Sequence, residues 1–200
     1  TDSLNSNFSL NMINVQSGEA GIEQYNFNLT AQKYEGSLWA KGSMPGNLKV
    51  CLLNGKTVLA EKELTQITSD WQEHTFQLNP GTAITNGTLK ISFNDTGVVY
   101  LDQISMMGQD AIDKNGYRPD LFEAVKALQP PIIRWPGGCY VSAYFWKDGI
   151  GPQYTRQVYP VELWNDRDVN SYCTDELLQM CEAMGAEPLI VINTGILNTT

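Results

Sequence analysis

The sequence of 200 residues is 42% hydrophobic and 18% charged, with 22 acidic and 13 basic side chains and a net charge of −9. This composition is typical of globular proteins of one or two domains. An acidic chain without a basic patch argues against nucleic acid and anionic membranes as partners. No apolar run approaches the roughly 20 residues that span a bilayer. The chain begins with Thr1 and shows no signal peptide, so we expect a mature product or an excised fragment.

Cysteine and histidine usage argues against a metal centre. The four cysteines, at positions 51, 139, 173 and 181, form no C-x-x-C pair, and His74 is the sole histidine. We therefore expect no metal site, no cofactor and no disulfide framework, and no Ser-His-Asp or Cys-His catalytic set.

Potential glycosylation acceptors are frequent. Sequons of the form N-x-S/T begin at Asn7, Asn28, Asn86, Asn94 and Asn198. In a secreted eukaryotic protein they would be acceptors, whereas in a bacterial protein they would indicate only a polar surface, and both alternatives stay open. We expect a secreted or periplasmic location.

Residues 1–107 are predicted to form an antiparallel β-sandwich of jelly-roll type. Apolar and polar residues alternate from Tyr25 to Ala31, which is the period of a half-buried strand. Further strands are expected at 36–41, 48–53, 57–64, 71–78, 88–93 and 98–105. Asn54-Gly55 predicts a two-residue hairpin, and Asn86-Gly87 is interpreted as another turn.

Aromatic side chains of this β-domain have two possible roles. Tyr25, Tyr34, Trp39 and Trp71 could offer their rings to the faces of sugars. For Trp39 and Trp71, which lie in alternating strands, packing in the core is the favoured interpretation.

Residues 108–200 are predicted to form the first part of a (β/α)8 TIM barrel. A helix is expected from Pro119, followed by a strand at 132–135 and a long loop. A second helix, capped by Thr174 and ended by Gly185, precedes a buried parallel strand at 188–193. Two strands cannot close an eight-stranded barrel, so we expect a truncated barrel that belongs to a larger enzyme.

The loop after the first of these strands has the composition of a site. Residues 136–152 combine glycines, aromatic rings and charges directly after a strand, where α/β barrels build their active sites. The alternative is a turn whose aromatic side chains only pack, and composition alone does not decide between the two.

The same region resembles a known family. Residues 134–139 read Arg-Trp-Pro-Gly-Gly-Cys, and residues 141–152 read Val-Ser-Ala-Tyr-Phe-Trp-Lys-Asp-Gly-Ile-Gly-Pro. With Arg156, Trp164 and the segments at 175–177 and 185–188, they resemble the family 51 α-L-arabinofuranosidases over about residues 116–200. Residues 10–107 resemble the carbohydrate-binding-type jelly roll inserted near the start of the barrel in some members.

The resemblance implies a glycoside hydrolase that removes terminal non-reducing α-L-arabinofuranosyl groups from arabinan, arabinoxylan or their oligosaccharides by a retaining mechanism. In the family, both catalytic glutamates lie on later barrel strands, and the acid/base belongs to an Asn-Glu pair. No such pair occurs here, so no catalytic residue is expected in this fragment, which should be inactive alone. The alternatives are a carbohydrate-binding module without activity and an enzyme of other sugar specificity, such as an endoglucanase.

The resemblance therefore assigns to this chain only candidates for substrate-binding residues. Arg134 matches the family arginine beside the catalytic carboxylates, where a positive charge would keep a nucleophile ionised. Cys139 stands where many relatives have asparagine, so a thiol, which is only a weak hydrogen-bond donor, replaces the polar contact of the amide. Trp164 matches a tryptophan that closes over the sugar. The weaker candidates are Trp146 and Asp148, which lie in the motif and could only shape the loop, and Asn193 at a strand end.

Three acidic residues of the loop invite a different interpretation. Glu162, Asp166 and Asp168 could be paired carboxylates. Because the sequence offers them no partners, we interpret them as a solvated face.

Overall fold

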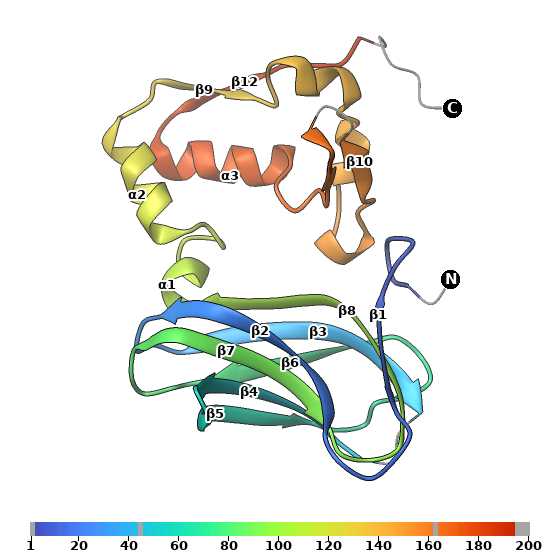
Figure 1. Ribbon diagram of the computed structural model, residues 1–200. Coiled ribbons are helices and arrows are strands. Elements are labelled where there is room, and N and C mark those ends of the chain that lie inside the picture. Colours follow the sequence, from blue (N-terminus) through green and yellow to red (C-terminus); the bar gives the residue numbers. More distant parts are fainter. Residues whose placement is uncertain (1–2, 44–45, 162–163, 195–200) are drawn as a thin grey trace. The chain divides into compact units, whose positions relative to one another are not determined.

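The computed structural model describes residues 3–43, 46–161 and 164–194. The chain divides into two compact units, Thr1–Arg118 and Pro119–Thr200 (Figure 1). The composition changes after Gly108, but helix α1 (Gln109–Ile112) stays with the first unit. The amide of Gln109 donates to the carbonyl of Lys33 over 2.9 Å, and the amide of Asp110 donates to the side chain of Gln32 over 3.0 Å. These bonds explain why the first unit extends past residue 107.

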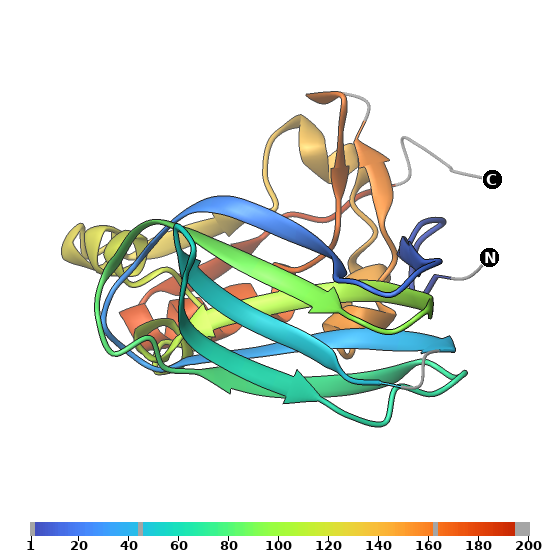
Figure 2. The same ribbon diagram turned by 60° about the horizontal axis from the view of Figure 1, so that its bottom comes forward.

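The first unit is an antiparallel β-sandwich, as predicted (Figure 2). In its described part, four strands form sheet A and four form sheet B. Sheet A has the order β1 (Leu10–Asn14), β8 (Gly97–Gly108), β3 (Tyr34–Ser43) and β6 (Gln72–Leu78). Sheet B has the order β2 (Ala20–Leu29), β7 (Ile84–Phe93), β4 (Leu48–Asn54) and β5 (Thr57–Leu64). Strand β1 was not predicted, because only two of its five residues are buried.

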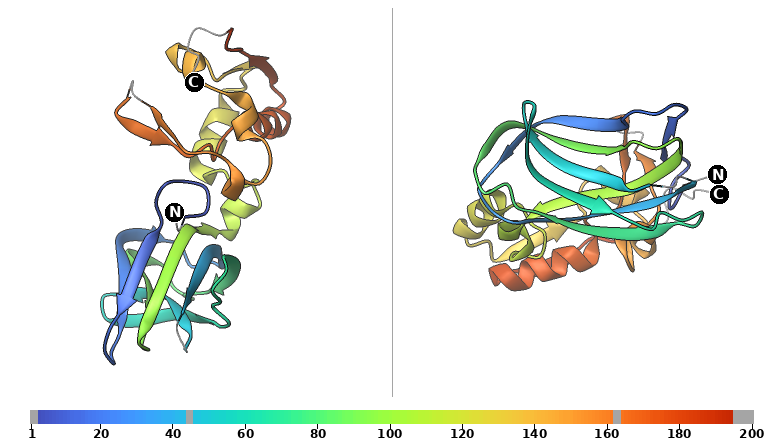
Figure 3. Two further views of the ribbon diagram at one scale, coloured as in Figure 1. Left: turned by 90° about the vertical axis from the view of Figure 1, so that its right-hand side faces the viewer. Right: turned by 90° about the horizontal axis from the view of Figure 1, so that it is seen from below.

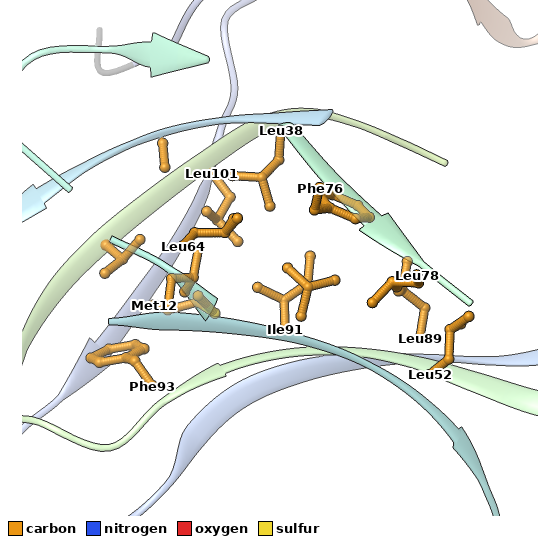
Figure 4. Close-up of a cluster of buried hydrophobic side chains, with 14 of the residues drawn as sticks. Met12, Leu38, Leu52, Leu64, Phe76, Leu78, Leu89, Ile91, Phe93 and Leu101 are labelled. Carbon is orange, nitrogen blue, oxygen red and sulfur yellow. The ribbon is translucent and has the colours of Figure 1, made fainter. Parts of the chain in front are cut away.

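Alternating side chains of the two sheets fill the space between them. Leu38, Leu101 and Phe76 from sheet A and Leu52 and Ile91 from sheet B belong to one cluster of buried side chains between the sheets (Figure 4). Such two-sided burial of apolar surface is the main stabilising term of a sandwich. Of the alternating residues recognised from Tyr25 to Ala31, Phe27 and Leu29 pack against this core, whereas Tyr25 is 60% exposed.

Truncation of a central core residue tests this arrangement. Leu38 is fully buried, so we expect Leu38→Ala to lower the free energy of unfolding of the chain by about 2–5 kcal/mol. The matched control is Ile13→Ala on β1, whose side chain is 59% exposed and whose loss should change stability by less than about 0.5 kcal/mol. Urea denaturation measures both; equal losses would contradict the assigned core.

Two turn predictions need correction. The hairpin predicted at Asn54-Gly55 exists, but its two turn residues are Gly55 and Lys56. Asn54 belongs to the strand, because it pairs with Thr57. Asn86 and Gly87 form no turn between strands, because they lie inside β7. The register of β7 against β2 shifts there, and the positive φ of Asn86 (57°) belongs to that irregularity. An Asn-Gly pair signals a positive φ, which bulges use as well as turns.

The core interpretation of Trp39 and Trp71 is wrong. Both side chains are only half-buried, whereas Leu38 and Ala40, on either side of Trp39, are fully buried. Successive strand residues point to opposite faces, so Trp39 lies on the outer face of sheet A. The ammonium group of Lys41 lies 5.3 Å from the ring centroid of Trp71.

The second unit contains a parallel strand pair covered on one side by a helix. It begins with α2 (Pro119–Ala127) and β9 (Ile132–Trp135), both as predicted. A long loop then carries the 3-10 helices η1 (Cys139–Ala143), η2 (Trp146–Gly149) and η3 (Gln153–Thr155) and the short hairpin β10 (Tyr159–Val161) and β11 (Asp166–Asp168). Helix α3 (Thr174–Met184) leads to β12 (Glu187–Ile190), which pairs with β9 in parallel.

The ends of α3 follow from local chemistry. Gly185 ends the helix in the left-handed conformation, as predicted. At the start, the cap is Cys173 rather than Thr174. The side chain of Glu176 accepts a hydrogen bond from the amide of Cys173 over 2.8 Å, which is half of a capping box.

The burial predicted for the last strand is not observed. All four residues of β12 are exposed, although the strand is parallel as expected. Within the described residues the sheet has two strands, and α3 packs against it through Leu177 and Cys181. The residues of β12 therefore have no covering layer among the described residues of the second unit. In the described part of the chain, no helix is long and apolar enough to cross a membrane.

Candidate functional site

The carboxyl ends of β9 and β12 lie side by side. Arg134 pairs with Leu189 in the parallel register, and the amide of Val191 donates to the carbonyl of Trp135 over 2.6 Å. Ile133 and Trp135 pack toward the α3 cluster, so the alternation of the strand directs Arg134 to the open face. The loops after both strands therefore begin at one edge, which is where parallel sheets build their sites.

The two glycines after Pro136 shape the first loop. Gly137 and Gly138 have φ values of 67° and 53°, in the region that favours glycine. The guanidinium of Arg134 lies under Gly137: a Cβ there would come within 3.0 Å of its Nε atom. Gly137 thus combines a required backbone conformation with close contact to the candidate arginine.

The other candidates of this loop take different positions. Cys139, the first residue of η1, is exposed and not paired in a disulfide. Trp146 is 54% exposed, and the ammonium group of Lys147 lies 5.8 Å from its ring centroid. Asn193 donates from Nδ2 to the carbonyl of Ser142 over 2.8 Å, so this side chain holds η1.

Asp148 has a defined structural partner. Its Oδ2 atom accepts a 2.6 Å hydrogen bond from the hydroxyl of Tyr159 on β10. Burial, together with this bond and the charge of Asp148, raises the pKa of Tyr159 to about 12. Tyr159 therefore stays protonated near neutral pH, and Asp148 connects η2 to the hairpin.

Trp164 belongs to a chain of aromatic contacts. It is 60% exposed, and its ring centroid lies 5.7 Å from that of Tyr140. Tyr140 contacts Tyr144 at 5.6 Å, and Tyr144 contacts Trp135 at 5.8 Å. The chain thus leads from an exposed ring to the strand β9, and it gives Trp164 a rigid base.

Sequence reasoning missed Tyr140 and misread Asp168. The hydroxyl of Tyr140 donates to Oδ2 of Asp168 on β11, so Asp168 is not part of a solvated face. Asp166 is exposed, in agreement with the prediction, and Glu162 lies outside the described residues. The position of Tyr140 beside Cys139 in the motif could have marked it as a site residue. Its partner, Asp168, could not be recognised, because it lies on a strand 28 residues further along the chain.

A buried arginine holds the long loop together. Arg156 is 5% exposed and donates to the carbonyls of Gly151 and Asn170 over 2.9 Å each. Its third bond, of 2.8 Å, goes to Oε1 of Glu176 on α3. Burial raises the pKa of Glu176, but the hydrogen bonds from Arg156 and the amide of Cys173 outweigh it, so that the pKa lies below its usual value. The pair stays ionised near neutral pH.

No group of three or more metal-binding side chains gathers in the described ranges. In the first unit, a groove of about 830 Å³ lies on the outer face of sheet A. The polar part of its lining includes Glu35, Ser37, Glu73, Thr75, Gln77 and Ser105, and the apolar part includes Phe76, Met107 and Ile112.

Comparisons with known proteins agree with the motif. Residues 124–200 match the family model described as the alpha-L-arabinofuranosidase 1 domain. The chain is 42% identical over 88 residues to alpha-L-arabinofuranosidase C of Emericella nidulans. This alignment covers 44% of this chain and 18% of that protein. It is 44% identical over 81 residues to an intracellular exo-alpha-L-arabinofuranosidase of Bacteroides ovatus, covering 40% and 16%. The chain thus spans less than a fifth of the length of these relatives.

One solved structure matches almost the whole chain. An arabinose-bound α-L-arabinofuranosidase of family 51 aligns with 96% of this chain and 33% of its own, at a TM-score of 0.80 and 21% identity. At that identity the match shows the fold alone. Residues 124–200 are thus similar in sequence to the alpha-L-arabinofuranosidase 1 domain, and the fold of almost the whole chain is similar to that of a family 51 α-L-arabinofuranosidase.

Proposed function

We propose that this chain is part of an enzyme that hydrolyses terminal non-reducing α-L-arabinofuranosyl groups of arabinan, arabinoxylan or their oligosaccharides. The observation that carries the proposal is the family match over residues 124–200, which includes Arg134 on the open face of β9. In this proposal, residues 108–200 are the first part of a (β/α)8 barrel, and β9 and β12 are neighbouring barrel strands. The exposed face away from α3 would then be the barrel interior.

The proposed mechanism is retaining hydrolysis. One glutamate would attack the anomeric carbon and a second would protonate the leaving oxygen, with the two carboxyl groups about 5–5.5 Å apart. We place both glutamates on barrel strands outside this chain. Arg134 would bind near the nucleophile and lower its pKa, and Trp164 would cover the sugar ring. Cys139, Trp146, Asp148 and Asn193 would shape the loop around them.

The test is an assay of the full-length protein on an aryl α-L-arabinofuranoside. We expect turnover, with the α-anomer of arabinose as the first product seen by NMR, and no turnover by the 200-residue chain alone. A full-length protein that folds but cleaves only aryl glucosides or xylosides would refute the proposed specificity. Arabinose release by the pure chain would refute the placement of the catalytic glutamates.

A second candidate function concerns the groove on sheet A. We propose that residues 1–107 form a module that binds neutral oligosaccharides, because the groove offers hydroxyl, amide and carboxylate groups to a polyhydroxylated ligand. Trp39 lies on the same outer face. Calorimetric titration of the chain with arabino- and xylo-oligosaccharides tests this.

Paired variants locate the binding. We expect Glu35→Ala/Glu73→Ala in the groove to weaken affinity at least about tenfold, since each loses a charged hydrogen-bond acceptor. The matched control is Glu61→Ala/Glu63→Ala on β5, which makes the same charge change in sheet B. No heat with any of these glycans, or equal effects of the two pairs, would reject the groove as the site.

A further inference from the structure

The hairpin β10–β11 and helix η1 bring two aromatic rings together. Trp164 is 60% exposed and Tyr140 is half-buried, and their planes make an angle of 31°. Two neighbouring rings at this inclination offer adjacent apolar faces to which a sugar ring can bind. The hairpin projects from the rest of the second unit (Figure 3), so the position of Trp164 depends on what holds the hairpin.

Hydrogen bonds connect this aromatic pair to the interior of the unit in successive steps. Tyr140 donates to Oδ2 of Asp168, and the other carboxylate oxygen, Oδ1, accepts from the amide of Asn170 over 2.8 Å. The carbonyl of Asn170 accepts from Arg156 over 2.9 Å, and Arg156 is paired with Glu176. The path therefore leads from the exposed rings to the start of α3.

We propose that Arg156 is a positioning residue that acts through Asn170 and Asp168 to set the aromatic pair of Tyr140 and Trp164 against the substrate. The proposal rests on the proposed function and adds Tyr140 to its substrate-contacting residues. Arg156 touches no substrate. It fixes the carbonyls of Gly151, in the middle of the loop, and Asn170, near its end, relative to one helix.

An arginine is needed because three acceptors lie around one planar group. The guanidinium donates from Nε, Nη1 and Nη2 to three different residues, in fixed directions. A lysine at this position keeps the charge and the bond to Glu176 but cannot hold both carbonyls in the same plane. Arg156→Lys thus separates the ion pair from the positioning of the loop.

The first test compares kinetic constants of the full-length protein on an aryl α-L-arabinofuranoside, well below the unfolding temperature. We expect Arg156→Lys and Tyr140→Phe each to raise KM about tenfold with a smaller change in kcat, because binding contacts shift while the reacting groups stay. The control is Tyr172→Phe, which removes the phenolic hydroxyl that contacts the sulfur of Met180 and should leave both constants unchanged.

The second test needs no activity. Acrylamide quenching of tryptophan fluorescence is measured on the 200-residue chain, and the part due to Trp164 is obtained by subtracting the Trp164→Phe form of each variant. We expect Trp164 to become more accessible in Arg156→Lys and in Tyr140→Phe but not in Tyr172→Phe. Tyr140→Phe keeps the ion pair of Arg156 and Glu176, so it tests the position of Trp164 even if Arg156→Lys unfolds.

The outcomes separate the two proposals. If the wild type cleaves the substrate and the folded variants keep both KM and the quenching of Trp164, the positioning role is refuted and the proposed function stands. If the wild type cleaves no arabinofuranoside, the proposed function fails. In that case the quenching experiment alone decides whether Arg156 sets the position of Trp164.

Discussion

Replacing Arg156 with alanine is expected to destabilise the second unit by about 3–5 kcal/mol, because it leaves a partly buried carboxylate without its partner. Arg156 is 5% exposed, and the side chain of its partner Glu176 is 18% exposed. The variant also leaves the carbonyls of Gly151 and Asn170 without this donor. This one substitution thus removes an ion pair and two contacts to the backbone.

The pH dependence of stability shows whether the destabilisation comes from the lost ion pair between Arg156 and Glu176. The pKa of Glu176 in the folded chain is below its usual value, so the pair stabilises the folded state above the unfolded pKa of about 4.3. This contribution is lost as the pH falls through the lower, folded pKa. In Arg156→Ala that part of the acid dependence should disappear.

Guanidinium denaturation at neutral and at acid pH, followed by near-UV circular dichroism of the full chain, measures both effects. Glu182→Gln, an exposed change on the same helix, serves as the control and should leave stability and its pH dependence as in the wild type. A loss below about 1 kcal/mol for Arg156→Ala would mean that the pair behaves like a surface ion pair.

Replacing Arg134 with alanine is expected to lower kcat/KM of the full-length protein on an aryl α-L-arabinofuranoside at least about a hundredfold. Under the proposed function, the guanidinium lies beside the nucleophilic carboxylate and stabilises its ionised form. Its loss should also move the acid limb of the pH–rate profile to higher pH, because the nucleophile then protonates more easily.

Two comparisons make this prediction specific. Arg134→Lys keeps the charge and should retain part of the pH profile while losing the planar contacts. Lys126→Ala, on the exposed side of α2, should change neither kcat/KM nor the profile. If Arg134→Ala folds and keeps wild-type kcat/KM, Arg134 has no role at the site and its contact with Gly137 is purely structural.

Predictions from sequence were accurate where local periodicity decides the structure. The strand at β9, the helix that begins at Pro119 and the end of α3 at Gly185 all agree with the structure, because residue spacing and glycine chemistry act over a few positions. The errors occurred where one pattern has two outcomes. Asn86-Gly87 indicates a positive φ but not whether it serves a turn or a bulge, and alternation places Trp39 on one face without saying which face is inside.

The candidate site shows the same limit. Its motif residues were recognised by resemblance, and the structure shows Arg134 on the open face of β9 and Trp164 as an exposed ring. The contacts that organise the loop were missed, since Asp168 and Tyr140 lie 28 residues apart. Asp168 looked like a solvated charge because a sequence shows no partner at that separation.

By itself, the sequence determined the β-sandwich, the parallel strand–helix–strand segment and the resemblance of residues 124–200 to the arabinofuranosidase domain, since these depend on period, turn chemistry and a long specific motif. Only the tertiary structure decided which acidic residues carry hydrogen bonds, which face each tryptophan occupies and that Arg156 joins two separate points of the loop to α3. The reason is physical: a hydrogen bond or a buried charge depends on groups that folding brings together from distant positions, whereas a strand or a cap depends on its neighbours in the chain.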